Sequence, residues 1–230
     1  MKLLVDSINK AICLNFEREV VLTELDLTKP SRYKVKSELS TDYNYRPYGE
    51  KDLNAVIKFC EEIGDPTEVD LIKRLIEHKC NGVLFFKDAA LIGYYWWYAK
   101  RIKNGYSYAL DRLPIKLEGE NEIYAEYFYI TPPNRGQGLA LYLLSEMYAN
   151  HRSNGYTKIY GYVDIKNISA HWIYKILGCE EIKRFKEYTI TINGKKRKIF
   201  YYGNHPKDIY LFVAQNLFRW MRSIITKKSS

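Results

Sequence analysis

The sequence predicts a mixed α/β fold, in which a mostly antiparallel sheet contains one parallel pair of strands and is flanked by helices. The chain has 230 residues, of which 47% are hydrophobic, and this is enough to bury a sizeable core. Short strand patterns come first, and a β-α-β-α pattern follows. A helical crossover is the usual connection between parallel strands. Residues 123–130 and 158–163 are therefore the predicted parallel pair, around a helix at residues 138–152.

Three segments are predicted along the chain. Residues 1–44 are an N-terminal extension, and residues 45–202 are the main domain. Residues 203–230 are a basic C-terminal segment, in which apolar residues recur at helical spacing over residues 209–225.

The N-terminal extension combines three patterns. Apolar residues from Leu3 to Phe16 predict an amphipathic helix. Residues 19–27 resemble a strand and end before Pro30. The polar stretch 31–44 is a predicted loop or linker.

The main domain begins with two predicted helices. Asp52 caps the first, which begins at Leu53, and Pro66 suits the first turn of the second, over residues 69–78. The other predicted elements are a hairpin over residues 82–87 and 91–100, an irregular insertion over 101–121, a helix over 169–177 that ends at Gly178, and a hairpin over 188–192 and 198–202 around Asn193 and Gly194.

Charge and cysteine content exclude several classes of protein. Twelve of the 36 Lys and Arg residues, but only two of the 27 Asp and Glu residues, lie from Lys183 onwards. This local cationic tail argues against a nucleic-acid binder, whose basic surface would lie on the main fold. The four cysteines form no CxxC pair and no zinc-type cluster with histidine, so we expect reduced thiols, no metal site and a cytoplasmic protein. The apolar run at the N-terminus breaks at Asp6, so no signal peptide is expected.

Two glycines separate the first strand of the parallel pair from its helix, in the run Thr131-Pro-Pro-Asn-Arg-Gly-Gln-Gly-Leu-Ala140. Gly136 and Gly138 let the backbone approach a ligand, and their N–H groups add to the donors of the helix N-terminus. Such a site holds anionic phosphates, with Arg135 as a charge-assisted donor. A plain strand-to-helix turn is the alternative. A Rossmann site is disfavoured, because Leu141 stands where its third glycine belongs.

A second motif opens the helix after the parallel pair, in the run Asn167-Ile-Ser-Ala-His-Trp-Ile-Tyr-Lys-Ile-Leu-Gly178. This run and the order Arg-x-x-Gly-x-Ala at 135–140 resemble the two signatures of the GNAT superfamily of GCN5-related, acyl-CoA-dependent N-acyltransferases. The resemblance covers about residues 45–190. Cys179 replaces the usual aromatic residue, which we expect to affect packing more than catalysis.

The resemblance implies a central sheet that splays open between its parallel strands, with acetyl-CoA in the splay. The loop amides would hold the pyrophosphate, and the backbone of the preceding strand would pair with the pantetheine and support the thioester carbonyl. Asn167 would bind the cofactor arm or simply cap its helix. The acetyl-CoA-binding residues implied in this way are Phe128, Tyr129, Ile130, Arg135, Gly136, Gln137, Gly138, Leu139, Ala140 and Asn167.

The same resemblance implies two catalytic residues. Tyr174 matches the tyrosine that protonates the departing thiolate, and aromatic packing is the alternative. Glu126 is the candidate general base, on a strand face shared with Phe128 and Ile130, and an exposed strand carboxylate is the alternative. His171 is a second candidate base, and a solvated histidine on the helix surface is the favoured alternative. No serine or cysteine has an evident partner that would make it a nucleophile, so direct transfer from acyl-CoA to the amine is preferred.

These features predict an N-acetyltransferase for a small amine. A weaker resemblance to bacterial GNAT proteins of surface-polysaccharide assembly suggests an amino-sugar acceptor. Protein or peptide acetylation, and an inactive CoA-binding module, are the alternatives. We expect no nucleic-acid partner. The basic C-terminal helix is expected to contact an anionic membrane surface, its own domain or a homodimer partner.

Overall fold

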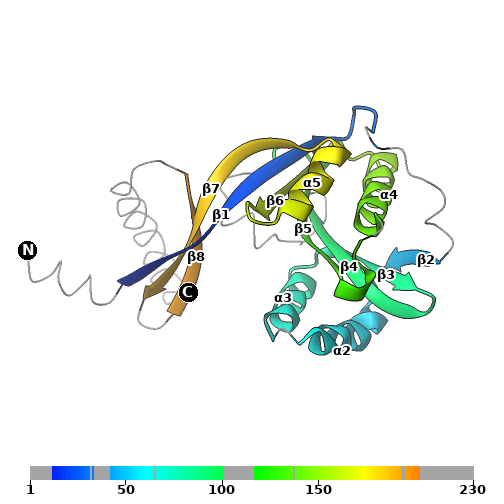
Figure 1. Cartoon of the computed structure of the whole chain (residues 1–230), viewed down its shortest axis with the longest axis horizontal. Helices are drawn as coiled ribbons and strands as arrows, with labels where there is room; N and C mark the ends of the chain where they lie inside the picture. The colour runs from blue at the N-terminus through cyan, green and yellow to red at the C-terminus, as the bar shows by residue number, and fades with distance from the viewer. Residues whose placement is uncertain are drawn as a thin grey trace, which may run out of the picture. The chain divides into compact units, whose positions relative to one another are not determined.

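The structure is a computed structural model that describes residues 12–31, 33, 42–64, 66–100, 117–136, 138–192 and 195–202. The chain divides into two compact units (Figure 1). The larger consists of residues 21–183, and the smaller consists of residues 1–20 and 184–230. Two long strands, β1 (Ile12–Asp26) and β7 (Glu180–Ile192), contribute residues to both units.

The larger unit contains a mixed sheet, in which the strand order is β2-β3-β4-β5-β6 followed by β1. Neighbouring strands from β2 to β5 are antiparallel, whereas β5 and β6 are parallel. The predicted fold class and its parallel pair are therefore confirmed. The strands are β2 (Tyr43–Pro47), β3 (Asn81–Lys87), β4 (Ala90–Ala99), β5 (Glu122–Ile130) and β6 (Lys158–Asp164).

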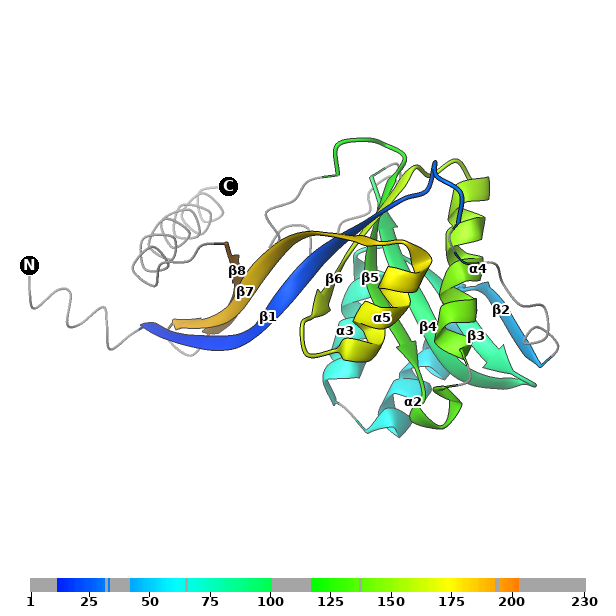
Figure 2. The same ribbon diagram turned by 45° about the horizontal axis from the view of Figure 1, so that its top comes forward.

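Helices cover both faces of this sheet (Figure 2). On one face, α2 (Leu53–Ile63) and α3 (Pro66–Glu77) pack against β3 and β4 through a core that includes Phe59, Ile72 and Trp96. On the other face, α4 (Leu139–Ser153) and α5 (Ile168–Leu177) contribute to a core that includes Leu143, Leu177 and Ile123. Tyrosine and tryptophan occupy much of both cores, and Tyr94, Tyr95 and Trp96 of β4 are buried in them.

Local signals set most helix and turn boundaries as predicted. Pro66 begins α3, where its fixed φ is compatible with a helix. Gly178 ends α5 with a φ of 92°, the left-handed conformation that glycine adopts at low cost. Asp52 precedes α2, but its carboxylate accepts the backbone N–H of Gly49 (2.9 Å) and makes two hydrogen bonds with Arg46 (2.6 and 2.7 Å). It therefore closes the preceding 3-10 turn and does not cap the first amides of α2.

The predicted helix over Leu3–Phe16 is wrong where the structure describes it, because Ile12 and Phe16 lie in β1. The strand conformation is stabilised within the smaller unit by cross-strand pairs. The ring of Phe16 lies 5.5 Å from that of Tyr188 on β7, and Arg18 forms an ion pair with the buried Glu187. Helical spacing of apolar residues does not reveal such pairs, since they require a partner strand about 170 residues away.

Other boundaries also differ from the prediction. β2 begins at Tyr43, inside the predicted loop. β7 begins at Glu180, well before the predicted start at residue 188, because its charged first half does not show the pattern of a strand. β7 pairs with β8 (Lys195–Tyr201) in the predicted antiparallel hairpin. The predicted turn residues Asn193 and Gly194, most of the 101–121 insertion and the helix at 209–225 lie outside the described residues.

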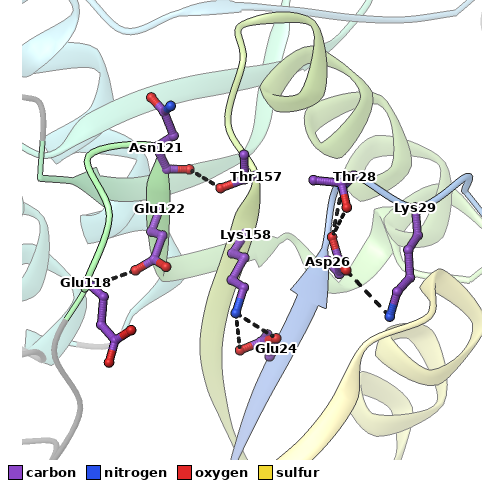
Figure 3. Close-up of polar contacts among 9 residues, drawn as sticks. All are labelled: Glu24, Asp26, Thr28, Lys29, Glu118, Asn121, Glu122, Thr157 and Lys158. Carbon is purple, nitrogen blue, oxygen red and sulfur yellow. Dashed lines mark hydrogen bonds and ion pairs between the residues drawn. The ribbon is translucent and has the colours of Figure 1, made fainter.

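Polar contacts hold together the end of the sheet where β5 and β6 begin (Figure 3). The backbone N–H of Thr157 donates to the carbonyl of Asn121 (2.8 Å). Lys158 at the start of β6 forms an ion pair with Glu24 of β1 (3.4 Å). The buried carboxylate of Glu122 accepts the backbone N–H of Glu118 (2.6 Å). These contacts align the first residues of both parallel strands.

Candidate active site

The two parallel strands pair over only part of their length. The pairing runs from Glu122 opposite Lys158 to Tyr124 opposite Tyr160, although β5 continues to Ile130 and β6 to Asp164. Beyond these three pairs, within the described residues, the edge of β5 that faces β6 has no strand partner. Backbone groups at such an edge can pair with an extended ligand.

A β-bulge lies where the parallel pairing ends. Trp96 of β4 pairs with Tyr127, whereas Trp97 pairs with Ala125, so Glu126 is the extra residue. A bulge bends a strand and redirects side chains, and bulges are frequent beside active sites. The bend therefore lies on the strand that carries the predicted thioester-binding backbone.

The glycine loop turns sharply between β5 and α4. Gly136 and Gly138 have φ values of 95° and 79°, and a Cβ built at Gly136 would meet no atom within 4 Å. Gly138 is the N-cap residue just before α4 and has no side chain that could accept from the first-turn amides. The loop thus presents an open surface next to helix N–H donors, which is the arrangement that binds phosphate.

Arg135 connects this loop to the end of β5. Its Nε donates to the carbonyl of Ile130 (2.8 Å), and its guanidinium lies over the ring of Tyr129, 5.3 Å from the centroid. The residue itself is exposed, so its guanidinium is a charged donor beside the loop. The predicted cofactor-binding residues from Phe128 to Ala140 therefore form one continuous segment, except that Gln137 lies outside the described residues.

Asn167 caps α5. Its Oδ1 accepts the backbone N–H of Ala170 (3.1 Å), which satisfies one of the donors at the helix N-terminus. This is the structural role that the sequence left open beside ligand binding. Binding of the cofactor arm by Asn167 stays a prediction.

Tyr174 is half-buried on α5 and packs against the core that α4 shares with the sheet. Burial raises the pKa of its phenol to about 12. Its neighbourhood also contains Tyr95 and Tyr148, whose pKa values are raised by burial and, to a smaller extent, by Tyr174. A phenol with this pKa stays protonated at neutral pH, so Tyr174 can act as a proton donor while also packing.

The bulge changes the position expected for Glu126. Phe128 and Ala125 both pack against the α4 side of the sheet, which strict alternation forbids for residues three apart. The face of Glu126 therefore does not follow from that of Phe128. The half-buried carboxylate lies near Cys80 and Tyr124, since it contributes, after burial, to raising the pKa of both groups.

His171, the second candidate base, lines a pocket of about 440 Å³ between α5, β1 and β7. Its Nδ1 lies 3.8 Å from Oε1 of Glu181. Tyr174 and Cys179 line the same pocket. The structure thus gives His171 an acidic neighbour and a partly enclosed position instead of a fully solvated one.

No protein family and no curated protein matches the chain by sequence, but solved structures resemble its fold. The first is the region of a fungal multi-domain GH3 beta-N-acetylglucosaminidase described as a GCN5-related glucosamine N-acetyltransferase (TM-score 0.57, 14% identity, 80% of this chain and 22% of that chain). The others are a tandem GNAT protein from the clavulanic acid biosynthesis pathway (0.52, 13%, 80% and 57%) and a GCN5-related N-acetyltransferase from Sphaerobacter thermophilus (0.50, 15%, 89% and 59%).

The chain has the GNAT fold. It spans between about a fifth and three fifths of the length of these three chains. At this level of identity the likeness concerns the fold alone. In this GNAT-fold chain, the residues of β5 that pair with β6 come first, the bulge follows, and the glycine loop leads from the end of β5 into α4.

Sequence reasoning missed one group of polar residues on the opposite face of the GNAT sheet. Glu68 of α3 is only 5% exposed, and it accepts hydrogen bonds from the hydroxyls of Tyr127 (2.6 Å) and Tyr94 (3.0 Å). The sequence shows Glu68 only as an acidic residue in a first helical turn, where it suits the helix dipole. The pairing of β4 with β5 brings the two tyrosines to it, so no local pattern could have found this group.

Among the described residues, no group of three or more His, Cys, Asp or Glu side chains could hold a metal ion. No helix in the described part of the chain is long and apolar enough to cross a membrane.

Proposed function

We propose that this chain is an acetyl-CoA-dependent N-acetyltransferase that transfers the acetyl group directly to a primary amine, that of an amino sugar. One observation carries the proposal: the end of the β5–β6 pairing and the open glycine loop lie on the same strand-loop-helix segment. An extended ligand with an anionic end fits this combination, because the strand edge can pair with an amide-containing arm and the loop can hold a diphosphate.

Acetyl-CoA matches both parts of that description, and when bound it would supply an acyl thioester. The loop from Arg135 to Ala140, including Gln137, would bind its diphosphate. The backbone of Phe128, Tyr129 and Ile130 would pair with its arm, and Asn167 would contact the same arm. The open space at Gly136 supports this assignment.

The side chains of the chain would then move protons. Tyr174 holds a proton on its phenol oxygen at neutral pH and would give it to the sulfur that leaves the acyl group. Glu126 would take a proton from the attacking nitrogen, directly or through a water molecule. Burial raises the pKa of the thiols of Cys60, to about 11, and of Cys179, to about 12, so neither is a ready nucleophile at neutral pH. Direct transfer is therefore preferred to a covalent acyl-enzyme.

The amino-sugar acceptor is supported by one structure of similar fold, a fungal region that is described as a glucosamine N-acetyltransferase. A role in surface-polysaccharide synthesis is carried by the sequence resemblance alone. A peptide amine would need an open acceptor groove. An inactive CoA-binding module would bind the donor without turnover.

The net charge of the chain supports a second partner for the smaller unit. Residues 1–20 and 184–230 hold 14 of the 36 basic residues and only 5 of the 27 acidic ones. The larger unit therefore has balanced charge, and the net charge of +9 belongs to the smaller unit. We propose that this unit of a cytoplasmic protein contacts an anionic membrane surface. Salt-sensitive sedimentation with phosphatidylserine vesicles, and not with phosphatidylcholine vesicles, would support the contact, whereas a stable homodimer without vesicle binding would contradict it.

The enzymatic proposal is tested with the full chain. Calorimetry with CoA and acetyl-CoA measures donor binding, and release of free thiol in the presence of glucosamine or a lysine-containing peptide measures transfer. Saturable binding and turnover of glucosamine support the proposal. Turnover of the peptide alone would reassign the acceptor, and binding without turnover of either amine would indicate the inactive module.

A further inference from the structure

A buried carboxylate lies on the face of the sheet opposite α4. Each oxygen of Glu68 accepts one phenol: Oε1 from Tyr127 (2.6 Å) and Oε2 from Tyr94 (3.0 Å). Among the described residues, no cation forms an ion pair with Glu68. A buried carboxylate costs free energy unless hydrogen bonds or a positive charge compensate it. Two neutral hydroxyls compensate the charge in part, so the site attracts a cation.

Further aromatic rings pack against the two phenols that bond this carboxylate. The ring of Tyr94 lies 6.1 Å from that of Tyr127 and stacks on that of Tyr129 at 5.7 Å. Phe59 of α2 approaches Tyr129 edge-on, with centroids 6.3 Å apart. Aromatic faces beside an anion are the usual surroundings for an ammonium group, because both attract positive charge.

Tyr127 connects the buried carboxylate to the strand of the proposed acyl-donor site. It directly follows the bulged residue Glu126 and precedes Phe128. Unlike Tyr94, which is fully buried, Tyr127 is half-buried. Its phenol oxygen donates its hydrogen to Glu68 and retains lone pairs that can accept a hydrogen bond from an incoming N–H.

We propose that Glu68 is a positioning residue that, through Tyr127, binds the acceptor as an ammonium ion and receives its proton. This inference rests on the proposed function and adds to it the protonation state in which the acceptor enters. Tyr127 is the group that contacts the nitrogen. The acceptor class is a cationic primary amine flanked by apolar or ring carbon surface.

The proton transfer balances without a further reactant. The ammonium gives one proton to the phenol oxygen of Tyr127, while the phenol hydrogen of Tyr127 moves to Oε1 of Glu68. The nitrogen keeps its electron pair and becomes a neutral nucleophile, and Glu68 becomes a carboxylic acid that later returns the proton to solvent. The second nitrogen proton leaves to Glu126 as the C–N bond forms, and Tyr174 protonates the sulfur.

Groups from α2, β4 and β5 lie near Glu68. Cys60 of α2 lies next to the hydroxyl of Tyr94, with Sγ 3.9 Å from the oxygen. Two side chains shift the pKa of Tyr129 on β5 in opposite directions. Arg135 lowers this pKa, whereas Glu68, like burial, raises it. The Arg135 guanidinium lies over the same ring of Tyr129, 5.3 Å from its centroid.

The test compares Glu68→Gln with Glu77→Gln, which removes an exposed carboxylate from the same helix. Glucosamine and its neutral counterpart glucose are the probes, measured by calorimetry in the presence of CoA and, for glucosamine, by turnover across pH. We expect Glu68→Gln to weaken glucosamine binding and raise its KM about ten- to a hundredfold, the range for a lost charged hydrogen bond. Glucose binding, acetyl-CoA affinity and Glu77→Gln should stay within about twofold.

Two further readouts separate this role from a purely structural one. The acidic limb of kcat/KM for glucosamine, to which Glu126 also contributes, should change in Glu68→Gln, and Tyr127→Phe should reproduce the KM effect. The double variant should be no worse than either single one, because both act on one proton path. Equal losses for glucosamine and glucose, or an unchanged pH profile in a folded Glu68→Gln protein, would overturn the inference. Failure of the wild-type chain to bind acetyl-CoA would instead overturn the proposed function.

Discussion

Replacing Gly136 by tryptophan places an indole in the open space at the glycine loop, where a Cβ would meet no atom within 4 Å. The φ of 95° at this position costs a non-glycine residue roughly 1–2 kcal/mol. Gly155 offers a matched control, since it also has a positive φ (76°) and also has nothing within 4 Å of its Cβ position. It lies after the C-terminus of α4, at the opposite end of that helix from the loop. Both variants should therefore lose similar stability.

Only Gly136→Trp should lose the donor. Two loop amides that bind a diphosphate contribute about 1.5–3 kcal/mol each as charge-assisted hydrogen bonds. Blocking both should weaken acetyl-CoA binding by about a hundred- to ten-thousandfold. The difference between the two variants cancels the cost of backbone strain, so it measures the loop's role in binding.

Calorimetry with acetyl-CoA gives the affinities, and thermal unfolding confirms that both variants are folded. A destabilisation of this size lowers Tm by roughly 2–4 °C per kcal/mol in a chain of this length. If Gly136→Trp bound acetyl-CoA as tightly as Gly155→Trp does, the diphosphate would not lie on this loop.

Three other predictions follow from particular side chains. Tyr174→Phe should lower kcat by about a hundredfold or more and leave acetyl-CoA affinity unchanged. The control is Tyr148→Phe, at a buried tyrosine of the same cluster, which should keep its kcat. Equal rates for the two variants would show that Tyr174 only packs. Because the pKa of Tyr174 is about 12, its phenol stays protonated below that pH, and kcat measured up to about pH 10 should show no loss assignable to it; a loss that Tyr174→Phe abolishes would contradict this. Arg46 lowers the pKa of Asp52 to about 2 from 3.8, so Asp52 stabilises the fold above pH 3.8 and this contribution is lost as the pH falls towards 2. Asp52→Asn should therefore lower the free energy of unfolding in urea by about 1–2 kcal/mol at neutral pH, allowing for solvent screening at the partly exposed Arg46, and by little near pH 2. The control Asp70→Asn, at an exposed position, should cost little at either pH. A cost that does not depend on pH would refute the ion-pair account.

Sequence by itself determined the parts of this protein that depend on neighbours in the chain. Proline at the start of α3, glycine at the end of α5 and two glycines before α4 each act through their own backbone conformations, so their effects are local. The order of β5, the glycine loop, α4 and β6 then follows from periodicity and from the crossover rule for parallel strands. The two motifs identified the resemblance for the same reason, since each lies within one short segment.

Tertiary structure alone decided where distant segments meet. Pairing with β7 makes Ile12–Phe16 a strand despite its helical spacing of apolar residues, because cross-strand contacts outweigh weak local preference. The register of β4 against β5 creates the bulge at Glu126 and brings Tyr94 and Tyr127 to Glu68. The extent of β5–β6 pairing, which opens the strand edge, is likewise a property of two strands and cannot be read from either one.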